Sequence, residues 1–430
     1  MERRNNVFLN PGQPSNELVT SLTRKLQNLS SQPSECCIYR VPERLRHANE
    51  KAYTPQFISI GPFHYGKEGL QAMEEDKMLY LQSFLQRTKI SLEHYIEFVR
   101  KREQKVRSHY AETFDGISSN QFVEMILVDA AFVVELLCRN YCRKEIDKND
   151  RIFHKPLKLL EIRHDMMLLE NQLPFCIFED IFPLTKLNVP QSSDKSALIK
   201  VTYKFFKAKA YLGEEKKILE KMGNSEIKHF VDFFRKCHVP TQPPRERKIQ
   251  TLTIPNVTKL YNAGVRFQRS TGSLLDINFS QGTLEIPLPR IRTSTESFIL
   301  NMLAFEQRHF LEYYINDYVF IINRLINSTE DAELLVQSGV FESKLTDTHK
   351  VIASINNLAR GSILRHKHFN FKDLSDGLRD YCSKPWNTWM ATLKRNYFSS
   401  PLTIFAVGVA TAVFLLTLIQ TLCSCGVSFK

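Results

Sequence analysis

The sequence predicts a mainly α-helical protein with a small β-hairpin element, in which a large helical domain is followed by one C-terminal transmembrane helix. Three observations support this fold class. Apolar residues recur at helical spacing along most of the 430-residue chain. The stretch LLDINFSQGTLEIPLP alternates around Ser280-Gln281-Gly282, which predicts two strands joined by a tight turn. From Asn396 to Phe429 no residue is charged.

The predicted elements divide the chain into five segments. A polar N-terminal segment (1–35) precedes the helical part of the domain (36–240), and the hairpin with further helices completes that domain (241–398). A transmembrane helix (401–422) and a short tail (423–430) follow. Within the domain, the expected helical stretches are Gln71–Tyr110, Asn120–Tyr141, one that ends at Pro174, a pair between Ser196 and Cys237, and Thr293–Asn327.

The uncharged C-terminal run carries the strongest physical signal in the chain. Pro401 to Leu422 is predominantly apolar and, at about 1.5 Å per residue, long enough to cross a hydrocarbon core of about 30 Å. Trp386 and Trp389 precede it, as interfacial aromatic residues do. Basic residues concentrate before the run and only Lys430 follows it. The positive-inside rule therefore predicts a tail-anchored, single-pass protein with its N-terminal domain in the cytosol, on the plasma membrane or an endomembrane.

Charge and spacing bear on the expected partners. The formal net charge of +12 is spread over short basic groups, and no zinc finger, RNA-binding signature or basic zipper accompanies it. We therefore expect no nucleic-acid partner, whereas an anionic membrane surface suits the positive excess. The spacing of Gly408 and Ala412 in the predicted span would allow two copies to pair as a homo-oligomer.

The cysteines and the N-terminus indicate a reducing compartment. Nine cysteines are an odd number, and none has zinc-site spacing. Cys138 and Cys142 lie one turn apart in an apolar helix, as buried free thiols do. The first residues, MERRNNVFLNPGQPSNE, contain no apolar stretch, so they do not resemble a secretory signal peptide.

One stretch, FISIGPFHYGKEGL, has the glycine–lysine spacing of a phosphate-binding loop. Such a loop needs successive backbone N–H groups and a hydroxyl after the lysine. Here Pro62 removes one donor, and Glu68 stands where the Ser or Thr should be. The sequence therefore predicts a rigid aromatic turn and no nucleotide cofactor.

A Glu-x-x-His pattern occurs at Glu161/His164, Glu226/His229 and Glu306/His309, and facing copies can build a di-metal carboxylate site. Some matches are expected by chance in a chain of this composition. Glu226 and His229 lie opposite an apolar helical face, which predicts that this copy faces solvent. Glu306 interrupts an apolar stripe, so we expect it to be buried with a polar partner. The prediction is no metal site and no other cofactor, with Glu161, His164, Glu306 and His309 as alternative metal ligands.

The stretch HDMMLLENQLPF gathers polar groups in one short span, His164 to Phe175. Continued as a helix, it points His164, Asp165 and Glu170 in three directions, so they do not form a catalytic group. An apolar stripe follows the opposite face and Pro174 ends the helix. We expect Glu170, Asn171 and Gln172 to satisfy backbone groups at the following turn.

Several motifs together resemble a known family. They are VPERLRHANEKAYTPQFISIGPFHYG, MEEDKMLYL, HDMMLLENQLPF, GVRF, LDINFSQGTLEIP, LNMLAFEQ and the C-terminal stretch from WNTWMATLKRNYF onward. In order and over residues 37–425, they resemble the plant-specific domain-of-unknown-function 247 family. The matching positions, which carry a structural role only, are Pro42, Tyr53, Pro55, Gly61, Pro62, His64, Asp129, Leu169, Glu170, Asn171, Gln172, Leu173, Pro174, Asn301 and Glu306. Ala130 and Leu402 depart from the pattern, where glycine and tryptophan are usual.

The resemblance implies a mostly helical plant domain with one C-terminal membrane helix, no assigned catalytic residues and no established activity. Some members are associated with pollen-side self-incompatibility in grasses, which suggests recognition but need not apply here. We therefore expect a non-enzymatic, membrane-anchored recognition or signalling protein that binds an unknown protein partner through its helical domain. A membrane-tethered metal-dependent hydrolase is the alternative. A third reading places the domain outside the cell as a ligand receptor, with its N-x-S/T sequons glycosylated.

Overall fold

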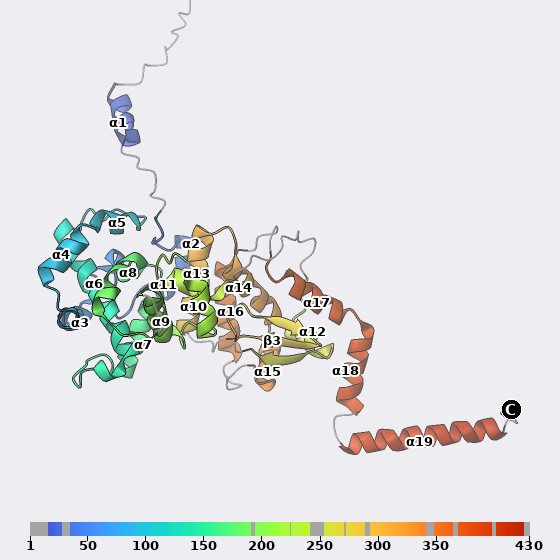
Figure 1. Cartoon of the computed structure of the whole chain (residues 1–430). Helices are drawn as coiled ribbons and strands as arrows, with labels where there is room; N and C mark the ends of the chain where they lie inside the picture. The colour runs from blue at the N-terminus through green and yellow to red at the C-terminus, as the bar shows by residue number, and fades with distance from the viewer. Residues whose placement is uncertain are drawn as a thin grey trace, which may run out of the picture.

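The computed structural model describes residues 16–27, 35–190, 194–223, 225–240, 253–270, 272–288, 293–340, 348–363, 369–397 and 401–424. Most of the predicted N-terminal segment, the proline-containing linker at 241–252 and the end of the tail from 425 lie outside the described residues. Between them the chain is mainly helical with one small sheet, as the sequence predicts (Figure 1).

The helices before the sheet are α1 (Asn16–Gln27), α2 (Glu43–Arg46), α3 (Glu74–Thr88), α4 (Leu92–Arg100), α5 (Glu103–Ser108), α6 (Ser119–Tyr141), α7 (Pro156–Asp165), α8 (Phe175–Ile181), α9 (Asp194–Phe206), α10 (Glu215–Met222), α11 (Phe230–His238) and α12 (Val257–Asn262). Short 3-10 turns include η1 (Glu50–Ala52) and η2 (Pro62–His64). After the sheet come α13 (Thr293–His309), α14 (Tyr314–Leu325), α15 (Thr329–Gln337), α16 (Thr348–Gly361), α17 (Lys372–Cys382), α18 (Pro385–Tyr397) and α19 (Pro401–Ser424).

The core of the N-terminal half forms around α6. Ser118 begins this helix with a capping box: its hydroxyl accepts from the Gln121 N–H, and the Gln121 side chain accepts from the Ser118 N–H. From Phe122 to Arg139 nearly every side chain of α6 is buried, so the helix is enclosed by the protein on all sides. The helices α3, α4 and α9 pack around it (Figure 1).

A second helical layer follows in the C-terminal half. There α13 packs against α14, α16 and α11, and it also contacts the 3-10 turn η1 from the N-terminal part of the chain. That contact joins the two halves, because residues 50–52 and 293–309 meet in one core.

The sheet contains the predicted hairpin and one strand that was not predicted. Strands β2 (Asn278–Ser280) and β3 (Thr283–Ile286) pair antiparallel, with Phe279 opposite Leu284. Gln281 (φ 48°) and Gly282 (φ 72°) form the turn, and two positive φ values are typical of a type I′ hairpin. Strand β1 (Arg266–Arg269) pairs parallel with β3, which gives the order β1-β3-β2.

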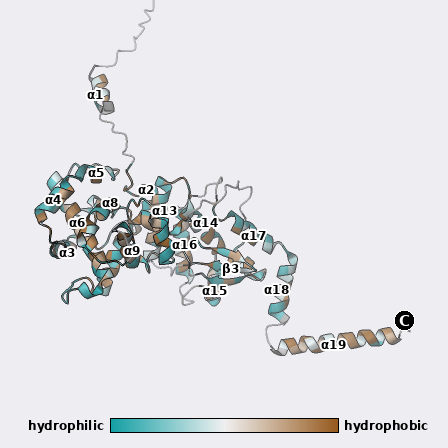
Figure 2. Ribbon diagram, in the orientation of Figure 1, coloured by the Kyte–Doolittle hydropathy of each residue, from teal (hydrophilic) through white to brown (hydrophobic). Residues whose placement is uncertain are grey.

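The last helix, α19, extends away from the folded body (Figure 1). Of the described residues, only Thr403–Ser424 forms a helix that is long and apolar enough to cross a membrane, and none of it is buried within the protein. Figure 2 shows the contrast between this apolar helix and the mixed surface of α18 before it. The predicted span at 401–422 therefore corresponds to one exposed apolar helix.

Several helix boundaries differ from the sequence predictions. The stretch Gln71–Tyr110 is broken into α3, α4 and α5; Lys89 adopts a left-handed conformation after α3, and Ser91 caps α4. The predicted pair between Ser196 and Cys237 is three helices, and Thr293–Asn327 is two. In the first case the helix ends at a left-handed lysine, which an apolar pattern does not mark.

The prediction that one helix runs to Pro174 is wrong. The helix α7 ends at Asp165, residues 166–171 form turns and bends, and residues 172–174 have no regular structure. The Asn171 amide donates to the Asp165 carbonyl, and the Gln172 amide donates to the carbonyls of Met166 and Leu168. These side chains satisfy carbonyls that a continued helix would have bonded itself. Pro174 instead precedes α8.

Candidate functional site

Polar side chains from α6, α7, α13 and the non-helical stretch after α7 converge beneath the segment that runs from Val41 to Gly61. We call this set the buried polar centre; it consists of Asp129, Asp165, Glu170, Asn171, Gln172 and Asn301. Each of these residues is at most 2% exposed. A buried polar group must find a partner, and here most of the partners are backbone groups of the segment or of its neighbours.

Four of these residues accept backbone N–H groups along the segment in order. Val41 donates to Glu170 Oε1 (2.7 Å), and Gln56, Phe57 and Ile58 donate to the Asp165 carboxylate at 2.7–3.3 Å. Ile60 donates to Asn171 Oδ1 (2.7 Å), and Gly61 donates to Asp129 Oδ2 (2.8 Å). The segment has little regular secondary structure, so these side chains supply the hydrogen bonds that a sheet or helix would otherwise provide.

The Gly61 contact also bears on the phosphate-loop pattern. One N–H group that such a loop would offer to phosphate is bonded to the Asp129 carboxylate. Gly61 has φ 78° and ψ −176°, a conformation that favours glycine, and an added Cβ would lie 2.6 Å from the Gln172 carbonyl oxygen. Pro62 then begins η2, and the Phe63 ring packs edge-on against Tyr110 and Phe114.

Two arginines and a histidine lie around Glu170 at the surface end of the centre, and Arg40 Nη1 is 3.7 Å from Glu170 Oε2. Arg46 forms an ion pair with Glu170 Oε1, and His64 Nε2 lies 3.4 Å from Oε2. Burial raises the pKa of Glu170, but the contacts with His64, the Val41 N–H and Arg46 together lower it below its usual value. Glu170 is therefore an ionised carboxylate that holds Val41 and Arg46, rather than a proton donor.

Asp129 forms a buried ion pair with Lys77 at 2.7 Å. Lys77 is 1% exposed and also contacts Glu74 at 2.7 Å. Burial lowers the pKa of Lys77, but the Asp129 and Glu74 carboxylates raise it by more, so the ammonium stays charged. The pair fixes α3 on α6 and presents the other Asp129 oxygen to Gly61.

Asn301 and Gln172 connect the two halves of the domain. Asn301 accepts from the Leu169 N–H (2.8 Å) and donates to the Ala52 carbonyl (2.8 Å). Gln172 accepts from the Phe230 N–H at the start of α11 (3.0 Å). Of the other prolines in the family motifs, Pro42 precedes α2 and Pro55 lies in the segment itself.

The four alternative metal ligands are placed in α7 and α13. Glu306 is fully buried, as expected; its carboxylate accepts from Arg235 Nε (3.0 Å) and from the Ile315 and Asn316 N–H groups (2.9 and 3.0 Å). The His309 ring stacks on Phe305, and His164 lies beside Asp165. Glu161 is exposed. Within the described ranges, no three His, Cys, Asp or Glu side chains group closely enough to hold a metal ion.

The prediction that His229 faces solvent is wrong. The helix α11 begins only at Phe230, so Glu226 and His229 do not share a helical wheel. His229 is fully buried and caps α11, where Nδ1 accepts from the Asp232 N–H and Nε2 lies 3.2 Å from the Cys37 carbonyl oxygen. Burial lowers its pKa to about 3, so the ring is neutral.

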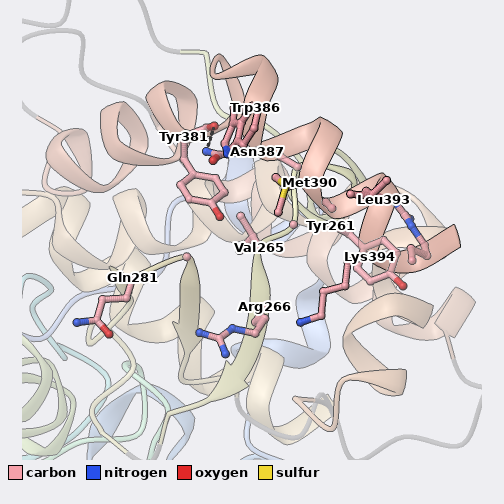
Figure 3. Close-up of a pocket in the computed structure, with 15 residues that line it drawn as sticks. Tyr261, Val265, Arg266, Gln281, Tyr381, Trp386, Asn387, Met390, Leu393 and Lys394 are labelled. Carbon is pink, nitrogen blue, oxygen red and sulfur yellow. Dashed lines mark hydrogen bonds between the residues drawn. The ribbon is translucent and has the colours of Figure 1, made fainter. Parts of the chain in front are cut away.

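A second feature is an open groove of about 860 Å³ between the sheet and the helices before α19 (Figure 3). We call it the basic groove. It is lined by Tyr261, Ala263, Gly264, Val265, Arg266, Gln281, Gly282, Tyr381, Trp386, Asn387, Met390, Ala391, Leu393, Lys394 and Arg395. Gly264 allows α18 to approach, because an added Cβ would lie 2.9 Å from Ala391 Cβ.

The basic groove was not predicted as a site from the sequence. Its walls come from three separate segments: the end of α12 with β1, the hairpin turn, and α17 with α18. The sequence did single out Trp386 as a membrane-flanking aromatic residue, and Lys394 and Arg395 are among the basic residues that precede the apolar run, but the cavity that they share was not predicted.

The comparisons with known proteins agree with the sequence motifs. The model of a family described as plant protein of unknown function (DUF247) matches residues 38–417. The UPF0481 protein At3g47200 of Arabidopsis thaliana is 26% identical over 422 residues, covering 91% of this chain and 87% of that protein. A second UPF0481 protein of the same plant, At3g02645, is 22% identical over 496 residues, covering 93% and 92%. No solved structure matches the chain. Because the family model spans nearly its whole length, the chain belongs to the DUF247 family of plant proteins of unknown function.

Proposed function

We propose that this protein is a membrane-anchored, non-enzymatic recognition or signalling protein whose helical domain binds another protein. In this proposal α19 crosses the bilayer and the domain lies in the cytosol. The exposed apolar surface of α19 supports an anchor, and the basic residues before it support the cytosolic orientation.

The observation that carries the binding proposal is the apolar face of α1, a helix that precedes the domain and would contact the partner together with it. Leu18, Val19 and Leu22 lie on one side of this helix and are 53%, 47% and 49% exposed. Amphipathic helices with an exposed apolar face commonly insert that face into a groove on a partner protein. The charges of α1 are nearly balanced, Glu17 against Arg24 and Lys25, which favours a protein groove over an anionic membrane surface.

The chemistry of the buried groups supports a role other than catalysis. The carboxylates of Asp165, Glu170 and Glu306 accept backbone N–H groups that would otherwise be unsatisfied. Burial raises the pKa of the Cys138 thiol to about 12, which makes it a poor nucleophile at neutral pH. These groups stabilise the domain on which a binding surface is displayed.

Site-specific photo-crosslinking in plant cells tests the binding proposal. A photoreactive residue replaces Leu22 in the full-length protein, and the matched control carries it at Arg24, on the opposite face of α1. We expect a discrete crosslinked species from position 22 that position 24 does not give. Equal crosslinking from both positions, or none from either, would contradict a partner at the apolar face.

Protease protection on sealed membranes, with a glycosidase shift on the same sample, tests the topology. A digested and unglycosylated domain is expected for a cytosolic location. A protected domain that shifts on glycosidase treatment would place it across the membrane and overturn the orientation.

A further inference from the structure

The basic groove beside α18 combines cations, aromatic rings and closeness to the apolar helix α19. We propose that it binds the phosphate-bearing headgroup of an anionic phospholipid in the membrane that holds α19. This assignment rests on the proposed membrane anchor.

The charge of the lining is the first argument. Arg266, Lys394 and Arg395 line the groove, and none of its fifteen lining residues is Asp or Glu. In the close-up, Lys394 extends from α18 toward β1, on which Arg266 lies (Figure 3). Elsewhere on the domain, exposed cations commonly have acidic neighbours, such as Lys217 with Glu214 at 3.2 Å. An uncompensated group of cations in a concave site attracts anions and focuses their field.

The environment of each cation leaves its charge available. Arg266 and Lys394 are exposed, and within the part of the chain that the structure describes neither side chain has a carboxylate partner. Arg395 donates to the neutral Asn262 side chain at 3.2 Å and lies over the Tyr261 ring at 5.0 Å. These contacts position the guanidinium without neutralising it, so it can still pair with a phosphate.

The apolar part of the lining is the second argument. Trp386 and Met390 are exposed on α18, 65% and 43% respectively, and the Trp386 ring packs against Trp389 with centroids 5.2 Å apart. A soluble phosphate ligand needs no such surface. A phospholipid does, because its glycerol backbone and upper acyl chains continue from the phosphate, and tryptophan favours that depth of a bilayer.

The position along the chain is the third argument. The helix α18 ends at Tyr397 and α19 begins at Pro401, and the two helices contact one another. The groove therefore lies at the membrane-proximal end of the domain. With the domain in the cytosol, the facing leaflet is the one that carries anionic lipids, which attract basic residues near the surface.

The composition of the chain provides a specific probe. The sequence contains 2 tryptophans, Trp386 and Trp389, and both belong to α18. We would reconstitute the full chain in phosphatidylcholine vesicles that contain a fixed fraction of phosphatidylserine. Bromine on the acyl chains of either lipid quenches tryptophan by contact, so comparing the two brominated lipids measures which one occupies the site.

We expect brominated phosphatidylserine to quench more than brominated phosphatidylcholine at the same mole fraction. The double variant Arg266→Gln with Lys394→Gln should lose most of this preference, about fivefold in relative affinity for each charge removed. Lys144→Gln with Lys148→Gln removes the same charge from exposed positions after α6 and is the matched control, which should keep the preference.

Three results would overturn the assignment. One is equal quenching by both lipids, and another is an equal loss in the groove variant and its control. The third is that millimolar inorganic phosphate, at an ionic strength matched with chloride, abolishes the preference for brominated phosphatidylserine, which would assign the groove to a soluble anion. Flotation of the chain with vesicles distinguishes failure of the lipid assignment from failure of the membrane anchor. A chain that does not float with vesicles refutes the anchor and the lipid assignment together. A chain that floats but shows no preference for phosphatidylserine refutes the lipid assignment of the groove alone.

Discussion

The buried polar centre and the basic groove use polar side chains in opposite ways. In the centre, Asp165, Glu170 and Asn171 are buried and bonded to backbone N–H groups. In the groove, Arg266 and Lys394 are exposed and, among the described residues, face no carboxylate. The strongest sequence motifs of this chain therefore contain residues that stabilise the fold. The exposed groove is formed by residues that belong to weaker sequence motifs.

The largest effect should follow from breaking a buried ion pair. Glu306→Ala would leave Arg235, which is 4% exposed, without its carboxylate and would free the N–H groups of Ile315 and Asn316. We expect the free energy of unfolding to fall by about 3–5 kcal/mol. Urea unfolding of the full chain in mild detergent, followed by circular dichroism, measures this change.

The control for this substitution is Glu220→Ala. Glu220 is exposed on α10, and its removal should change stability by less than about 0.5 kcal/mol. Similar costs for the two substitutions would mean that Glu306 has no special role in the buried network.

The segment over the buried polar centre gives the next effect, with two glycines as a matched pair. Gly61 and Gly66 both have positive φ, but a Cβ at Gly61 would lie 2.6 Å from a carbonyl oxygen, whereas a Cβ at Gly66 would meet no atom within 4 Å. Gly66→Ala should cost about 1–2 kcal/mol from the backbone conformation alone. Gly61→Ala should cost at least about 3 kcal/mol, because the clash adds to the strain. The same unfolding measurement compares them, and equal costs would contradict the close approach of Gln172.

Much of this fold follows from local signals. The periodic stretch Asn120–Tyr141 is α6, and Ser280-Gln281-Gly282 lies at the hairpin turn, because helical spacing and turn chemistry act between near neighbours. Strand β1 has no such signal: its four residues, RFQR, pair parallel with β3 across intervening chain. Its pairing depends on tertiary contacts that no local pattern reveals.

In the two sites, too, the features set by near neighbours in the sequence could be predicted, and those that depend on tertiary contacts could not. The sequence selected Glu170 and Asn171 as groups that satisfy backbone, but their partners Val41 and Ile60 lie 129 and 111 residues away and could not be identified. His229 was misplaced because a helical wheel was applied before the helix begins. The basic groove combines three chain segments, so its shape exists only in the folded protein.

Asp317 is a buried carboxylate with few hydrogen-bond donors, so the effect of pH on it can be compared with the well-satisfied carboxylates of the buried polar centre. Burial raises its pKa to about 7, although Asn370 donates from both its N–H and its side-chain amide. Between pH 4 and 7 the folded state keeps a proton that the unfolded state has lost, so stability falls as pH rises through this window. The slope is at most about 1.4 kcal/mol per pH unit.

Asp317→Asn should remove this slope, because the amide oxygen can still accept from Asn370 and carries no charge to bury. Relative to the unmodified chain, the variant should gain stability at pH 7.5 and not at pH 4, as measured by unfolding at both values. The control Asp380→Asn, at an exposed position on α17, should change the free energy of unfolding at pH 7.5 and at pH 4 by the same small amount. A variant that is destabilised at pH 7.5 would show that Asp317 is needed as an anion.

The smallest effect on stability should come from substitutions in the basic groove, in contrast to the large effects expected in the buried polar networks. Arg266→Gln with Lys394→Gln removes two exposed charges that hold no other residue in place, so the free energy of unfolding should change by less than about 0.5 kcal/mol. Within that limit the free energy of unfolding can increase, because like charges that share a groove repel each other and the variant removes two of them. Unfolding in a zwitterionic detergent at low and high salt measures the difference in the free energy of unfolding between the variant and the unmodified chain. Salt should reduce this difference, because it screens the exposed charges. A loss of 2 kcal/mol or more would mean that these cations stabilise the domain as the centre does, and the distinction between a region that holds the fold and a region free to bind would fail.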